Sequence, residues 1–182
     1  MTPVMRGRVV VVVAVVLFAA ACSSTAGGSN TGTDGDSAQV MAAAVTELLT
    51  RDNTFGEGPP PFTTYLLQAN LDPTAGTVSR DPNVRLRPVI EAERWAIEAA
   101  LRSFGPVQWI GDPAEWITED LLPKIEGAGI LGVGEPIFDG DGALVPVSLW
   151  CGGLCGTWLT YRLVQTDEGW QVTGVEGPIA VS

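Results

Sequence analysis

The stretch that decides the fold is residues 143–165, which read ALVPVSLWCGGLCGTWLTYRLVQ. Apolar residues alternate with others on both sides of Gly152-Gly153-Leu154, a pattern typical of two antiparallel strands joined by a tight loop. A three-residue loop would place Cys151 opposite Cys155. The same register pairs Leu149 with Thr157, Val147 with Leu159, Val145 with Tyr161 and Ala143 with Leu163. All of these positions except Thr157 are apolar, so we expect this face of the hairpin to belong to the core.

The two hairpin cysteines, Cys151 and Cys155, are predicted to form a disulfide. Their register provides the Cα separation of roughly 5–6 Å that a disulfide requires. A redox-active pair is a second interpretation, but the spacing is C-x-x-x-C rather than C-x-x-C, and no histidine is available to activate a thiol. A metal site is a third interpretation, although two thiolates without histidine do not complete a tetrahedral shell.

Trp150 and Trp158 fall on the face of the hairpin opposite the apolar one, with Trp158 across from Ser148 and with Arg162 farther along. One interpretation is that this face packs under helices, which would bury the sheet on both sides. The other is that the indoles are exposed and stack on glycan rings or on a partner protein. In that case Trp150, Trp158 and Arg162 face the ligand.

Pro146 interrupts the first strand of the hairpin, and proline has no backbone N–H to donate to a neighbouring strand. Either this strand lies at an edge of the sheet, or its pairing with residues 129–138 is broken at Pro146 by a bulge.

The segments around the hairpin predict an α+β domain. Residues 129–138 and 170–175 add strands on either side, which makes an antiparallel meander of about four strands. Two to three helices are expected to pack on it, over residues 38–50, 88–104 and 112–122, with further strands at 62–71 and 107–110. In the last helix, Asp112 and Glu115 are interpreted as a capping box rather than as a catalytic pair. This order of elements resembles that of NTF2-like and cystatin-like rolls, in which a curved sheet wraps a helix.

The amino terminus has the pattern of an export signal. A short basic segment, residues 1–8, precedes the apolar run 9–21, which is too short to span a membrane. The run ends in Ala19-Ala20-Ala21-Cys22, which resembles the lipobox of bacterial lipoproteins, although that motif prefers leucine where Ala19 stands. The resemblance implies that Cys22 becomes the lipidated N-terminus at the extracytoplasmic face of the cell membrane. An ordinary cleaved signal with an incidental Cys22 is the alternative.

The domain organisation follows from this interpretation. Residues 1–21 are expected to be the signal peptide, residues 22–37 the lipidated cysteine with a flexible tether rich in glycine, serine and threonine, and residues 38–182 a single α+β domain. Residues 149–182 also resemble the C-terminal part of a group of uncharacterised exported bacterial proteins. They share a CGGLCG-type hairpin, an aromatic-rich strand and a G-W-x-V strand. That resemblance implies a recurrent structural feature and no activity.

The composition excludes several functions. The chain has 10 basic residues, 21 acidic residues and no histidine. Removal of residues 1–21, which contain Arg6 and Arg8 and no acid, leaves a net charge of −13. Nucleic acid would be repelled by this charge. Without histidine the chain has no Ser-His-Asp triad, no Cys-His pair and no imidazole metal site. The residues 139–142, Asp-Gly-Asp-Gly, are expected to form a turn rather than a calcium loop, so no cofactor or metal is predicted.

Two classes of function remain. The first is a membrane-anchored, non-enzymatic module that binds an envelope protein or a cell-wall glycan. The alternative is a small enzyme of the roll type that acts on a small molecule with carboxylates alone, for which Glu93, Glu115, Glu126 and Asp139 are candidates. A buried carboxylate without a partner would favour the enzyme. A filled core with its acids at the surface would favour the binding module.

Overall fold

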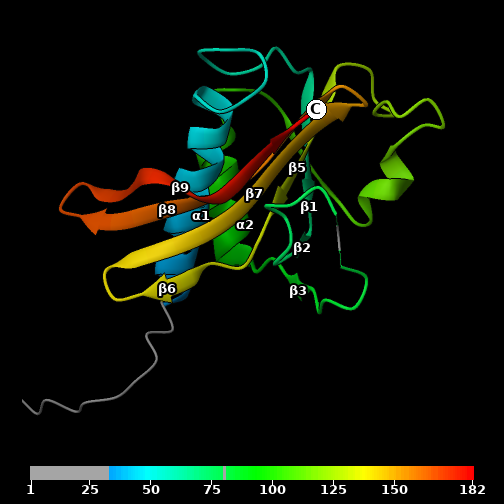
Figure 1. Cartoon of the computed structure of the whole chain (residues 1–182). Helices are drawn as coiled ribbons and strands as arrows, with labels where there is room; N and C mark the ends of the chain where they lie inside the picture. Colours follow the sequence, from blue (N-terminus) through cyan, green and yellow to red (C-terminus); the bar gives the residue numbers. More distant parts are fainter. Residues whose placement is uncertain (1–32, 80) are drawn as a thin grey trace, which may run out of the picture.

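The computed structural model describes residues 33–79 and 81–182. The predicted signal peptide, Cys22 and the tether as far as residue 32 lie outside the described residues. Over the described part the chain folds into two layers, with a twisted sheet on one side and two helices side by side on the other (Figure 1).

The helices are α1 (Asp34–Thr50) and α2 (Glu91–Leu101), and a short 3-10 helix, η1, covers Pro113–Trp116. The strands are β1 (Thr64–Gln68), β2 (Asn70–Leu71), β3 (Arg87–Pro88), β4 (Val107–Ile110), β5 (Ala128–Val133), β6 (Ile137–Asp139), β7 (Gly142–Gly152), β8 (Cys155–Thr166) and β9 (Gly169–Val181). No helix among these residues is both long and apolar enough to cross a bilayer.

The sheet is larger than predicted and it is mixed. It has seven strands in the order β4-β1-β5-β7-β8-β9, with β6 paired to β7. β1 is parallel to both of its neighbours, whereas the strands from β5 to β9 pair antiparallel. The structure is of the α+β class, but the predicted four-stranded antiparallel meander of an NTF2-like or cystatin-like roll is wrong. The error arose at β1 and β4, which local sequence marks as strands without indicating that they extend the sheet in parallel.

The register predicted for the hairpin is confirmed from Ala143↔Leu163 to Leu149↔Thr157. All eight of these side chains are buried. At the tip the prediction was wrong in one detail: Gly152 pairs with Cys155, and a bulge between Trp150 and Gly152 carries Cys151. The cysteine sulfurs nevertheless lie at disulfide-bonding distance, with a Cα separation of 5.1 Å.

Pro146 lies on a central strand, where the predicted break in pairing occurs. β5 pairs with residues 147–150 of β7, and β6 pairs with residues 142–144, so the proline falls in the gap between them. Its carbonyl accepts a hydrogen bond of 2.7 Å from Gly134 N. The predicted single strand 129–138 is therefore two strands, because Pro146 itself has no N–H to donate to the strand opposite.

The main core lies between the helices and one face of the sheet. α1 contributes Val40, Met41, Ala44, Val45, Leu48 and Leu49, all of them fully buried. The helix begins at Asp34, inside the segment predicted to be tether, because Thr33 is the N-cap and forms a capping box with Asp36. Ser37, which directly precedes the predicted helix 38–50, lies inside α1 and donates a hydrogen bond of 2.9 Å to Glu93 Oε1.

The predicted helix over residues 112–122 was wrong. Only η1 forms, and Ile117 then bridges to Pro123 as extended chain. Asp112 still caps the turn, since its Oδ1 accepts a hydrogen bond of 3.0 Å from Ala114 N. The segment links β4 to β5, which flank β1, and so crosses the face of the sheet that the helices leave open. Packing of Trp116 and Ile117 against that face stabilises this path over a regular helix.

Candidate functional site

The face of the sheet opposite the helices carries the candidate site. Two rows of paired residues cross it. One row consists of Leu66, Ile130, Trp150 and Gly156, and the other of Gly132, Ser148 and Trp158. The first row is large except for Gly156, whereas the second is small except for Trp158, so a large residue lies beside a small one at each step. On this face a hollow is therefore left over the small residues Gly132 and Ser148, between the larger side chains beside them.

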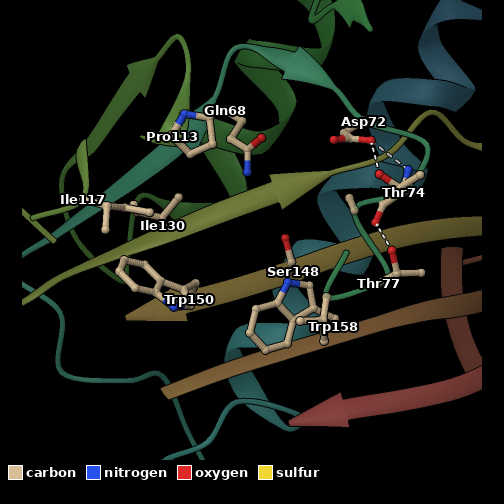
Figure 2. A pocket seen from close by; sticks show the side chains of 12 residues that line it. Gln68, Asp72, Thr74, Thr77, Pro113, Ile117, Ile130, Ser148, Trp150 and Trp158 are labelled. Atoms are coloured by element: carbon tan, nitrogen blue, oxygen red, sulfur yellow. Dashed lines mark hydrogen bonds between the residues drawn. The ribbon is translucent and has the colours of Figure 1, made fainter. Parts of the chain in front are cut away.

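We call this hollow the indole groove and define it by Gln68, Ile130, Ser148, Trp150, Trp158 and the loop 72–78. It encloses about 240 Å³. Figure 2 shows Trp150 and Trp158 on one side of the groove and Gln68 on the other, with the hydroxyl of Ser148 between them. The loop closes one end, and Pro113 and Ile117 lie at the opposite end. Segments from distant parts of the sequence therefore converge on one cavity.

Two glycines make the groove possible. A Cβ on Gly132 would lie 2.6 Å from Ser148 Oγ and 2.9 Å from Gln68 Nε2, so only glycine lets these two polar groups lie over β5. A Cβ on Gly156 would collide with the six-membered ring of Trp158, which lies across that residue. Because position 156 has no side chain, the Trp158 indole can lie close to the sheet there. Gly156 pairs with Trp150 in the β7–β8 register, so the two indoles are neighbours.

Besides Asp72 and the threonines of the loop, the groove has four uncharged side chains that can form hydrogen bonds. Within residues 33–79 and 81–182, the Gln68 amide, the Ser148 hydroxyl and the Nε1 atoms of Trp150 and Trp158 have no hydrogen-bond partner. Ser148 is only 7% exposed. Its hydroxyl oxygen still reaches solvent, since Trp170 Nε1 is the only fully buried side-chain nitrogen or oxygen without a partner among the described residues. These groups are therefore available to a ligand.

The charged residue of the groove is Asp72, and its carboxylate stabilises the loop. Its Oδ1 accepts hydrogen bonds of 2.8 Å from Thr74 N and 2.6 Å from Thr74 Oγ1. Gly76 then packs against β8, where a Cβ would lie 2.6 Å from Thr160 Oγ1 and 2.8 Å from Leu159 O. The end wall of the groove is thus held by local hydrogen bonds and by close backbone contact.

The predicted ligand-facing residues separate into two groups. Trp150 and Trp158 both line the groove. Arg162 does not, because its Nη2 lies 2.9 Å from Glu176 Oε2 in an exposed ion pair with β9. The interpretation that this face packs under helices was wrong, since both helices pack on the other face of the sheet. Gln68 and Ser148 were missed, although Ser148 was placed correctly opposite Trp158.

The four carboxylates proposed for an enzyme do not form a catalytic site. Glu115, Glu126 and Asp139 are exposed. Glu93 is buried but fully paired: Arg87 Nη2 lies 2.7 Å from its Oε1, and Ile90 N donates a hydrogen bond of 3.0 Å to its Oε2. Burial by itself raises the pKa of Glu93, but the hydrogen bonds from Arg87, Ile90 N and Ser37 outweigh burial and lower this pKa. Glu93 is thus ionised and structural.

A second, larger cavity of about 740 Å³ lies beside the disulfide. Its walls are mostly apolar and include Phe55, Phe62 and Leu122, and its charged groups, Asp120, Lys124 and Glu126, are all exposed. None of the polar residues of this cavity is buried, whereas Ser148 and Asp72 of the indole groove are. Because specificity in a binding site comes from a few placed polar groups, the smaller groove is the better candidate.

No cluster of three or more potential metal ligands occurs in the part of the chain that the structure describes. The chain has no significant match among protein-family models, curated proteins or solved structures. Its function must therefore be argued from the groove itself.

Proposed function

We propose that this chain is an extracytoplasmic lipoprotein, anchored to the cell membrane through Cys22, whose domain binds an envelope component without catalysing a reaction. The observation that carries the binding role is the indole groove, where four uncharged polar side chains converge without partners. These side chains offer hydrogen bonds and aromatic contact, and the carboxylate of the groove, Asp72, is hydrogen-bonded to Thr74. The paired state of Glu93 gives the carboxylate enzyme no support.

The lipobox-like residues 19–22 support the anchored location, as does the hairpin disulfide, since disulfides persist in oxidising compartments. When the full chain is expressed in an exporting bacterium, we expect it in the membrane fraction, with an N-terminal peptide whose mass includes diacylglycerol on Cys22. Cys22→Ala should release the protein from the membrane, because a stable anchor needs acyl chains. Cys155→Ser, which leaves the lipobox intact, is the control. A wild-type chain that still begins at Met1 in the cytosol would contradict the anchor.

Co-sedimentation tests the binding role. The full-length Cys22→Ala chain, which lacks the anchor, is mixed with insoluble envelope fragments of the exporting host. We expect the chain to pellet with the fragments, and we expect Gly132→Val to reduce pelleting about tenfold, because valine fills the floor of the groove. Gly174→Val is the matched control, since Gly174 lies on β9 outside the groove and a Cβ there would meet nothing within 4 Å. Equal pelleting of the unblocked and blocked chains, or no pelleting at all, would rule out groove-dependent envelope binding.

A further inference from the structure

We infer that the ligand of the indole groove is a neutral pyranose unit of a glycan. This inference rests on the proposed binding function and names the class of ligand. A pyranose ring has two kinds of surface, apolar faces lined by C–H bonds and a rim of hydroxyl groups. The indole groove has an apolar part that suits the faces of the ring and a polar part that suits its hydroxyl groups.

The apolar complement is formed by the indoles of Trp150 and Trp158, with Ile130 on the floor. The six-membered ring of Trp158 lies against Gly156, and the indole lines the groove. The π-face of an indole is the negative side of its quadrupole, and it attracts the weakly positive C–H groups of a sugar face. An aliphatic wall of the same area would supply burial but not this directional contact.

The polar complement is formed by Gln68 and Ser148, which lie across Gly132 from one another. A carboxamide offers two donors and an acceptor, and a hydroxyl offers one donor and accepts as well. A sugar hydroxyl also donates and accepts, so two adjacent hydroxyls of one ring can satisfy both side chains. The indole N–H of Trp150 or Trp158 adds a donor beside the stacked face. In an empty site, groups of this kind are satisfied by water, which a ligand replaces.

The charge and the volume of the groove limit the class of ligand further. No lysine or arginine is among the described residues that line the groove, Asp72 there is acidic, and the chain as a whole has a net charge of −11, so phosphorylated and acidic polymers are repelled. The volume of about 240 Å³ is smaller than the roughly 300–1,000 Å³ typical of sites for drug-sized ligands. The groove therefore holds one ring at a time, and because it is open to solvent, the ring can be part of a longer chain.

Isothermal titration calorimetry of the full chain with three neutral trisaccharides, N,N′,N″-triacetylchitotriose, cellotriose and maltotriose, tests this inference. We expect at least one of them to bind, with a negative heat-capacity change from burial of the sugar face. Hyaluronan fragments of matched length, which carry carboxylates, should bind at least about tenfold more weakly. Trp158→Ala and Ser148→Val should each weaken the preferred trisaccharide about tenfold or more.

Trp95→Ala is the matched control, because Trp95 lies on α2, is 69% exposed and is outside the groove; its removal should change affinity less than about twofold. Binding that Trp95→Ala and Trp158→Ala weaken equally would overturn the inference. So would the absence of binding by every trisaccharide up to millimolar concentration. If pelleting with envelope fragments depends on Gly132 while none of the saccharides binds or competes, the proposed function stands and the ligand is not a neutral sugar.

Discussion

Replacement of Arg87 by alanine is expected to lower the free energy of unfolding by about 3 kcal/mol. Arg87 donates to both oxygens of Glu93, whose side chain is 1% exposed. Removal of the guanidinium leaves a buried carboxylate with only the hydrogen bonds from Ser37 and Ile90 N. Breaking a buried pair on one side costs far more than the net value of the pair, because the remaining charge stays desolvated. Urea denaturation monitored by circular dichroism measures the loss.

Arg162→Ala is the matched control for Arg87→Ala. It removes an arginine of another ion pair, with Glu176, in which both side chains are about half exposed. Exposed pairs contribute little, so we expect a change below about 1 kcal/mol. Similar losses in the two variants would contradict the role assigned to the buried pair.

The same pair makes stability depend on pH. The pKa of Glu93 is lowered in the folded state, so its contribution is complete above the ordinary glutamate pKa of about 4.3 and is lost as the pH falls through the lowered value. In Arg87→Ala a protonated Glu93 no longer carries an unpaired charge. The stability difference between wild type and Arg87→Ala should therefore shrink as the pH falls, and a difference that grows would contradict this account.

Replacement of Leu149 by alanine is expected to destabilise the protein by about 3 kcal/mol, within the 2–5 kcal/mol range of buried leucines. Leu149 is 0% exposed, and its backbone pairs with Leu131 on β5 and Thr157 on β8. Its loss opens a cavity in the centre of the sheet, where the backbones of three hydrogen-bonded strands restrict collapse. Thermal and urea unfolding should both shift, with an unchanged urea m-value if the denatured state is unaffected.

Leu154→Ala is the control within the same hairpin. Leu154 lies at the tip and is 92% exposed, so we expect its truncation to change stability by less than about 0.5 kcal/mol. The two variants remove the same atoms, and only burial differs. Equal effects would mean that the face containing Leu149 is not the core of the sheet.

The groove illustrates why a site can be harder to predict than a strand. The positions of Trp150, Trp158 and Ser148 on one face followed from the register, which depends on residues close together in the sequence. Gln68 is on β1 and reaches the groove only because β5 inserts between β1 and β7. The loop 72–78 reaches it because Gly76 packs against β8. No local pattern in these segments indicates their neighbours across the sheet.

Sequence alone determined the β7–β8 hairpin, its buried face and the pairing of its cysteines, because side chains alternate along a strand and a short turn leaves few registers. Tertiary structure alone decided that β1 is inserted parallel between β4 and β5, that residues 112–122 cross the sheet without forming a long helix, and that both helices pack on one face. Those outcomes depend on contacts between segments far apart in the chain, where burial outweighs local propensity. The hollow that holds the two indoles is a consequence of that packing.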